Sequence, residues 1–218
     1  MTAARPPLPV VVLISGGGTN LQAIIDAQQR GELHIEIRAV ISNRADAFGL
    51  ERARRAGIAT TVVEHTRFAD RAEFDRALQA AIDASGARLV ILAGFMRILT
   101  PAFVQHYVGH MLNIHPSLLP NHRGLRTHEG ALAAGDTEHG ASVHFVTTEL
   151  DGGPLIAQAR VPVLAHDTTT TLAERVREQE HVIYPLVIGW YAAGRLRLEN
   201  GVAVLDDQAL AVPILINR

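Results

Sequence analysis

The chain has 218 residues, of which 48% are hydrophobic, and this is enough to bury a full core as one large domain or two small ones. Its formal net charge is -2, with acidic and basic residues interspersed, so bulk electrostatics gives no reason to expect a nucleic acid or an anionic membrane as a partner. Cysteine is absent, which excludes disulfides and thiolate metal sites.

The sequence predicts one domain over residues 1–218, because no linker, repeat or low-complexity run divides it. The N-terminal stretch MTAARPPLPV lacks the apolar core of a signal peptide, and no later run is long enough to span a membrane. We therefore expect a soluble, cytoplasmic protein. A homodimer is compatible with the sequence, which does not specify an oligomeric state.

Short apolar runs rich in β-branched residues alternate with amphipathic stretches in the first part of the chain. The expected strands are residues 10–15, 35–43, 60–64, 88–94 and 111–115. The expected helices are residues 20–31, 47–57, 71–86 and 100–109. Such alternation predicts an α/β fold with a doubly wound, mostly parallel sheet and helices on both of its faces.

The pattern changes after about Gly140. Residues 141–147 and 155–164 read as strands added antiparallel to the sheet, and residues 195–207 as a hairpin that turns at Asn200-Gly201. A long helix is expected from about Thr170 to Ala193, with Pro185 kinking it. Its apolar stripe should pack on the sheet and consists of Leu172, Val176, Ile183, Leu186, Val187 and Trp190. The final stretch ALAVPILINR fits no expected element.

A glycine-rich turn, SGGGTNL, joins the first strand to the first helix. Glycines let the main chain approach a ligand closely, and a helix N-terminus offers free N–H groups, so a phosphate is a natural ligand. The turn is not a Walker A loop, because Thr19 stands where that motif has lysine. It is not a dinucleotide-binding fingerprint either, because Leu21 stands where that motif has its third glycine. A tight turn with Thr19 as the N-cap of the helix, without a ligand, explains the three glycines equally well.

Two polar side chains interrupt the buried strand MLNIH. Asn113 and His115 are two residues apart, so they point to the same side of the strand. An amide and an imidazole together can stabilise an oxyanion, as acyl transfer requires. Asp151, in the turn ELDGGP, is a candidate carboxylate partner for the histidine, although spacing alone does not show that they meet. A buried histidine bonded to a main-chain carbonyl, and an ordinary turn aspartate, are the alternatives.

A metal site is not expected. His106 and His110 have helical spacing, but the glutamate that a zinc-protease motif requires does not follow His106. The other histidines considered are scattered through turns and strands and are His122, His128, His139 and His144.

Seven segments, in order and at matching separations, resemble the glycinamide ribonucleotide formyltransferase family. They are SGGGTNLQAIIDA, SNRADAFGLERARRAGI, LAGFMRIL, NIHPSLLP, HGASVHFV, ELDGGP and QEHVIYP, and the match extends from about Val10 to Leu205. NIHPSLLP with the later DGGP is specific to the formyltransferase superfamily. The resemblance implies transfer of a formyl group from 10-formyltetrahydrofolate, as co-substrate and without a metal, to the amine of 5-phosphoribosylglycinamide in purine biosynthesis.

The resemblance also implies roles for individual residues. The implied catalytic residues are Asn113, His115 and Asp151. The implied residues for the phosphoribosylglycinamide substrate are Gly18, Thr19 and Asn20, which would bind its phosphate, together with Gly94 and Glu180. The implied residues for the folate are Arg71, Met96, Arg97, Ile98, Leu99 and Asn113. Without the resemblance, Met96, Ile98 and Leu99 would be read as core and Arg71 as a solvated charge.

The sequence departs from the family pattern in the loop after NIHPSLLP. Many members carry an aromatic residue where this chain has His122, and proline or lysine where it has Arg123. We therefore expect a loop of altered shape, with the catalytic positions unaffected.

Three alternative functions share part of this pattern. A 10-formyltetrahydrofolate hydrolase has the same three catalytic residues but uses water as acceptor, and resembles this chain behind an additional N-terminal domain for which 218 residues leave no room. Methionyl-tRNA formyltransferase adds a basic C-terminal domain that is also absent. A non-catalytic phosphoribosyl-binding module would be favoured if Asn113, His115 or Asp151 were replaced, and all three are present.

Overall fold

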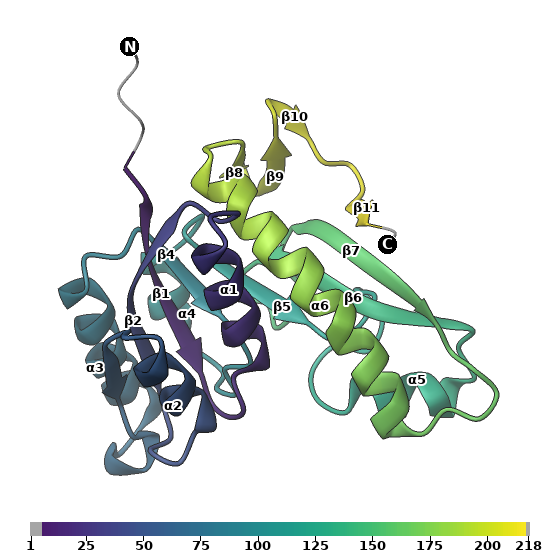
Figure 1. The fold of residues 1–218 in the computed structure, drawn as a ribbon, viewed down its shortest axis with the longest axis horizontal. Helices are drawn as coiled ribbons and strands as arrows, with labels where there is room; N and C mark the ends of the chain where they lie inside the picture. The colour runs from purple at the N-terminus through teal and green to yellow at the C-terminus, as the bar shows by residue number, and fades with distance from the viewer. Residues whose placement is uncertain (1–5, 217–218) are drawn as a thin grey trace.

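An eight-stranded sheet organises the fold in a computed structural model that describes residues 6–216 (Figure 1). The strand order is β11-β7-β6-β5-β4-β1-β2-β3. The strands are β1 (Leu8–Ile14), β2 (Ile35–Ser42), β3 (Thr60–Val62), β4 (Leu89–Leu92), β5 (Met111–His115), β6 (Glu138–Phe145), β7 (Leu155–Pro162) and β11 (Ile214–Ile216). Strands β1 to β5 are parallel, whereas β6 pairs antiparallel with β5 and with β7. The predicted mostly parallel sheet with later antiparallel strands is confirmed.

Helices cover both faces of this sheet. They are α1 (Thr19–Gln29), α2 (Phe48–Arg55), α3 (Arg71–Ala84), α4 (Pro101–His106), α5 (Thr127–Ala134) and α6 (Thr169–Ala192), with a 3₁₀ turn η1 (His65–Arg67). Alternate side chains of β1 join two different cores: Val10 and Val12 pack with α1, α2, α5 and α6, whereas Val11 and Leu13 pack with α3 and α4. Because both faces of β1 are fully buried, its sequence is a continuous apolar run.

The chain reverses its direction across the sheet between β1 and β4. It leaves β1 for β2 and β3 on one side and then returns to β4 and β5 on the other. The loops that follow β1 and β4 meet at this point, where the N–H of Ser15 donates to the oxygen of Gly94 at 3.0 Å. Ligands of doubly wound sheets bind at such a switch point, so the topology places the predicted site between these loops.

Helix α6 lies beside α1 and crosses the antiparallel part of the sheet (Figure 1). It continues through Pro185 as one helix. Four residues of the predicted stripe are fully buried against the sheet and are Leu172, Val176, Ile183 and Val187. Leu186, which we expected in the same stripe, is instead 37% exposed. That part of the prediction was wrong because Leu186, one residue before the buried Val187, points away from the sheet.

The C-terminal residues form a small antiparallel sheet of β8 (Leu196–Glu199), β9 (Val202–Leu205) and β10 (Gln208–Ala209). The predicted hairpin turn is confirmed, because Asn200 and Gly201 have φ values of 50° and 78°, as a type I′ turn requires. Besides the 3₁₀ turn η1, three elements were not expected, namely helix α5 and strands β10 and β11. Helix α5 buries only Thr127 and Ala131, so no apolar stripe reveals it, and β11 is defined by pairing with the distant β7. No helix in residues 6–216 is long and apolar enough to cross a membrane.

Candidate active site

The glycine turn leads directly into α1. Gly18 is the N-cap residue, with φ 69°, and no side chain caps the helix. A Cβ on Gly18 would lie 2.6 Å from Cα of Gly49, so only glycine fits this position. The alternative in which Thr19 serves as N-cap is therefore wrong, since Thr19 is already the first residue of the helix. The first N–H groups of α1 are consequently directed outward, in the arrangement that binds anions.

A cavity opens in front of this turn. It is lined by the turn residues 15–20, by Gly94 and Met96 from the loop after β4, and by Arg177 from α6. Arg177 was not predicted from the sequence, because it is an exposed residue on a long helix. Its position three residues before Glu180, and therefore on the same side of the helix, was the only available signal. The cavity thus combines main-chain donors, a helix N-terminus and a guanidinium, all of which suit a phosphate.

Glu180 of α6 contacts Asn20, one of the residues that line this cavity. Its carboxylate accepts a hydrogen bond from Nδ2 of Asn20 at 2.9 Å, and the residue is 8% exposed. Burial raises the pKa of Glu180, although the bond from Asn20 opposes the effect. The side-chain oxygen of Asn20 is buried without a partner among the described residues. The structure therefore directs the Asn20 amide toward Glu180, and its free oxygen could accept a substrate N–H.

The predicted pair on β5 shares one face of the strand. Leu112 and Ile114 belong to the core under α1 and α6, whereas Met111 belongs to the core under α3 and α4. Asn113 and His115 follow Met111 at intervals of two, so they lie on its side of the strand, at its carboxyl end. The structure thus delivers an amide and an imidazole side by side, as the alternation predicted.

Asp151 meets His115, which the sequence alone did not show. Its Oδ2 lies 3.5 Å from Nδ1 of His115 and accepts the N–H of Gly124 at 2.8 Å. Asp151 has φ 47°, a conformation that is uncommon outside glycine, asparagine and aspartate. The two side chains are 9% and 7% exposed, so water screens their interaction only weakly.

His144 is a further member of the site that the sequence analysis considered only as a scattered histidine. Its Nδ1 lies 2.9 Å from the oxygen of Phe145, and its Nε2 lies 3.1 Å from Nδ2 of Asn113. Burial lowers the pKa of His144, so the ring is neutral. Because a carbonyl only accepts, we assign the proton to Nδ1, and Nε2 must then accept from Asn113. This contact fixes which way the Asn113 amide points.

A second cavity borders Asn113 on its other side. It is lined by Arg97, Ile98 and Leu99, by Asn113 and His144, and by the turn 147–151. The guanidinium of Arg97 lies 5.1 Å from the ring centroid of Phe74. Asn113 therefore lines this cavity and shares its face of β5 with His115.

Two of the residues expected to contact the folate, Met96 and Arg71, do not line the cavity that holds Arg97, Ile98 and Leu99. Met96 lines the cavity at the glycine turn, and its N–H donates to Oγ of Ser15 at 2.7 Å. Arg71 is the first residue of α3, is exposed and does not line the cavity that holds Arg97. A role for Arg71 would require a ligand that extends beyond this cavity.

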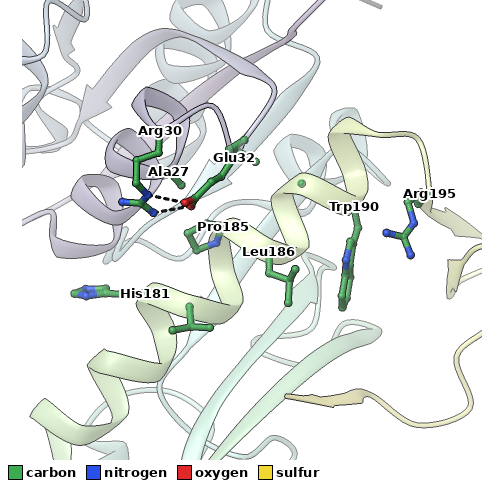
Figure 2. A pocket seen from close by; sticks show the side chains of 11 residues that line it. Ala27, Arg30, Glu32, His181, Pro185, Leu186, Trp190 and Arg195 are labelled. Carbon is green, nitrogen blue, oxygen red and sulfur yellow. Dashed lines mark hydrogen bonds and ion pairs between the residues drawn. The ribbon is translucent and has the colours of Figure 1, made fainter. Parts of the chain in front are cut away.

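Another hollow lies away from these residues, between α1, α6 and β8 (Figure 2). Pro185, Leu186 and Trp190 of α6 contribute apolar side chains, and Arg30 at its edge is paired with Glu32 (Figure 2). None of the predicted catalytic residues lines it. Within residues 6–216 there is also no group of three or more histidine, aspartate or glutamate side chains placed to hold a metal ion.

Comparison with known proteins places this geometry in a family. The family model described as formyl transferase matches residues 8–188. The chain is 59% identical over 201 residues to a phosphoribosylglycinamide formyltransferase of Escherichia coli, covering 92% of this chain and 95% of that protein. It is 48% identical over 193 residues to a human trifunctional purine biosynthetic protein, covering 88% of this chain and 19% of that protein.

Solved structures agree with the sequence relatives. A phosphoribosylglycinamide formyltransferase from Coxiella burnetii superposes with a TM-score of 0.93 at 58% identity, covering 97% of this chain and all of that one. A glycinamide ribonucleotide transformylase from Symbiobacterium toebii superposes with a TM-score of 0.88 at 45% identity, covering 91% of this chain and 94% of that one. The family match spans most of the chain and includes the glycine turn, the Asn113–His115 strand, Asp151 and Glu180. The chain belongs to the formyl transferase family.

Proposed function

We propose that the chain transfers the formyl group of 10-formyltetrahydrofolate to the amine of 5-phosphoribosylglycinamide, a step of purine biosynthesis. The observation that carries this proposal is the contact of Asp151 with His115 at the end of the strand that also carries Asn113, beside a cavity lined by Asn113 and Asp151. The cavity at the glycine turn, which suits a phosphate, supports it. The relatives named phosphoribosylglycinamide formyltransferase support the same reaction.

The acceptor would bind at the glycine turn. Its phosphate would lie against Gly18, Thr19 and the N–H groups at the start of α1, with Arg177 adding a positive charge. Its glycinamide part would extend past Gly94 to Glu180 and Asn20, which offer a carboxylate and an unpaired amide oxygen. This direction brings the acceptor amine toward the end of β5.

The formyl donor would occupy the cavity on the other side of Asn113. Arg97, Ile98 and Leu99 line that cavity, and the proposal extends the folate contacts to Met96 and Arg71. Asn113 borders this cavity, so it would contact the formyl group of the donor as well as the reacting centre.

In the proposed reaction, the acceptor amine attacks the formyl carbon and a tetrahedral oxyanion forms. Asn113 and protonated His115 would donate hydrogen bonds to this oxygen, which carries its full charge only after attack. Asp151 would stabilise the imidazolium and help remove a proton from the attacking amine. Collapse of the intermediate breaks the bond to N10 of the folate, and that nitrogen takes up a proton as it leaves.

An assay with and without the acceptor tests the proposal against its rivals. Rapid formylation of 5-phosphoribosylglycinamide, with release of tetrahydrofolate in equal amount, is expected. Formate release at the same rate without acceptor would instead identify a hydrolase. Binding of the acceptor with no turnover would identify a non-catalytic phosphoribosyl-binding module.

The same proposal includes three broader expectations. Residues 1–218 would act as one catalytic domain, and its partners would be the two small molecules rather than a nucleic acid or a membrane. The protein would work in the cytoplasm. Analytical ultracentrifugation tests whether it forms the homodimer that the sequence leaves open.

A further inference from the structure

Helix α2 packs directly against the glycine turn. A Cβ on Gly18 would lie 2.6 Å from Cα of Gly49, and a Cβ on Gly49 would lie 3.3 Å from the main-chain oxygen of Gly16. The first distance is shorter than real Cβ contacts allow, so a side chain at Gly18 would push the helix away from the turn. Glycines on both sides therefore allow α2 to reach the main chain of the turn.

This contact fixes two carbonyl groups of the turn. The N–H of Gly49, in the first turn of α2, donates to the main-chain oxygen of Gly16 at 3.0 Å. Nε of Arg52, three residues further along the helix, donates to the main-chain oxygen of Gly17 at 2.8 Å. The oxygens of two consecutive peptide groups are thus directed toward donors on α2.

The N–H groups of the same two peptide groups point away from α2. A planar trans peptide directs its N–H opposite to its C=O, so the N–H of Gly17 opposes the oxygen of Gly16, and the N–H of Gly18 opposes that of Gly17. Within residues 6–216, neither N–H has a hydrogen-bond partner. The three glycines line the cavity at the turn, whereas Arg52 lines a separate hollow with Gln22. Both donors are therefore available to an anion in the cavity, beside the N-terminus of α1.

The guanidinium of Arg52 is itself held in place. Its Nη1 donates to Oε1 of Gln22 at 3.2 Å, and Nε2 of Gln22 donates to Oδ1 of Asp26 at 2.8 Å. The guanidinium also lies 5.1 Å from the ring centroid of Phe48. Because these contacts limit its rotation, Nε stays directed at the oxygen of Gly17.

The charge of Arg52 is not offset by a carboxylate in contact with it. Its neighbours Arg54 and Arg55 pair with Glu51 at 3.8 Å and 2.9 Å, whereas Arg52 forms no ion pair within residues 6–216. A positive charge beside the turn favours an anion there and adds to the charge of Arg177, which lines the cavity. Arg52 thus combines orientation of the turn with a charge of the sign that a phosphate requires.

We propose that Arg52 is a positioning residue for the phosphate of the acceptor. It holds the peptide group between Gly17 and Gly18 so that the N–H of Gly18, next to that of Gly17, donates to the phosphate. The inference rests on the proposed acceptor site and assigns part of its selectivity for a phosphate to α2. Arg52 does not touch the phosphate in this account and acts through the main chain.

Kinetics with two acceptors tests this role. Arg52→Met keeps an extended side chain and removes the donor to Gly17. The KM for 5-phosphoribosylglycinamide should rise by about fivefold, with kcat changed less than about twofold, because the phosphate is bound alike in the ground and transition states. The preference for this acceptor over glycinamide riboside, expressed as the ratio of the two kcat/KM values, should fall by about the same factor. Arg54→Met, a change on the same helix at an exposed residue that pairs with Glu51, is the matched control and should keep the wild-type preference.

A spectroscopic readout separates positioning from general destabilisation. Titration of the wild-type protein with inorganic phosphate should move the amide proton signals of Gly17 and Gly18 downfield, as hydrogen bonds to an anion do. In Arg52→Met the Kd of phosphate should rise by about fivefold, and the Gly18 signal should move less at saturation. Arg52→Gln, which also shortens the side chain, serves if Arg52→Met does not fold.

Two results would overturn the inference. The first is a folded Arg52 variant with the wild-type preference for the phosphorylated acceptor and an unchanged response of the Gly18 signal. The second is an equal loss of kcat/KM with glycinamide riboside, which would show that Arg52 supports the fold rather than the phosphate site. A wild-type enzyme with equal kcat/KM for both acceptors would contradict the proposed phosphate site instead, so the two failures are distinguishable.

Discussion

Asp151 and His115 share a buried contact, with Oδ2 of the carboxylate 3.5 Å from Nδ1 of the ring, although a helix and a strand separate them in the chain. The turn that carries Asp151 is fixed by its glycines: a Cβ on Gly153 would lie 1.9 Å from the oxygen of Phe145. Because the turn cannot move away without losing this packing, the carboxylate stays beside the imidazole. The carboxylate is therefore placed to orient the His115 ring.

The phosphate of the acceptor should contribute strongly to the reaction. If the turn and Arg177 bind a phosphomonoester, glycinamide riboside without phosphate should react with a kcat/KM lower by about a hundredfold or more, because several charge-assisted hydrogen bonds are lost. Steady-state kinetics with both acceptors measures the difference. Equal kcat/KM values would remove the phosphate role of Gly18, Thr19 and Asn20.

The arginines on the folate side should act on donor binding. Arg97→Met should raise the KM for the folate by about tenfold and leave acceptor affinity nearly unchanged, because Arg97 lines the donor cavity and contributes to ground and transition states alike. Arg71→Ala should act in the same direction and more weakly, since Arg71 lies outside that cavity. Arg76→Ala, an exposed change on the same helix, is the control. A selective loss of acceptor binding would contradict both assignments.

Glu180 should make the protein less stable as the pH rises. Burial raises the pKa of Glu180 above that of an unfolded glutamate, so the folded state binds this proton more tightly than the unfolded state does. The favourable contribution of Glu180 to folding stability is fully present below about pH 4.3 and is lost as the pH rises through the pKa of Glu180 in the folded state. Glu180→Gln should therefore raise the melting temperature at pH 8 relative to wild type, more than it does at pH 4, while it weakens acceptor binding. A melting temperature lowered equally at both pH values would show that desolvation of the carboxylate is not the dominant effect.

Strand-level features of this site could be predicted from local patterns. The period of two along β5 placed Asn113 and His115 together, and the glycines after β1 marked a turn at which the chain approaches a ligand. His144 and Arg177 could not be placed in this way, because the first enters the site through antiparallel pairing with β5 and the second through the packing of α6 beside α1. The same holds for β11, whose three residues become a strand only by pairing with β7.

Asn113 and His115 should act as one unit. Asn113→Ala and His115→Ala should each reduce kcat by about 10²- to 10³-fold, since both donors act on a charge that exists only in the transition state. Because they serve the same oxygen, the double variant should lose much less than the product of the two single losses. Single-turnover rates of the four proteins measure this coupling, and fully multiplicative losses would mean that the two side chains stabilise different charges.

The coupling of Asp151 to His115 is tested most directly by an NMR titration of the His115 ring in wild type and in Asp151→Asn, combined with single-turnover formyl transfer. The substitution keeps the shape of the side chain and removes its charge. The account predicts that His115 is less protonated near neutral pH in the variant and that transfer slows by about a hundredfold, although the folate still binds. An unchanged His115 titration together with near-wild-type transfer would contradict it.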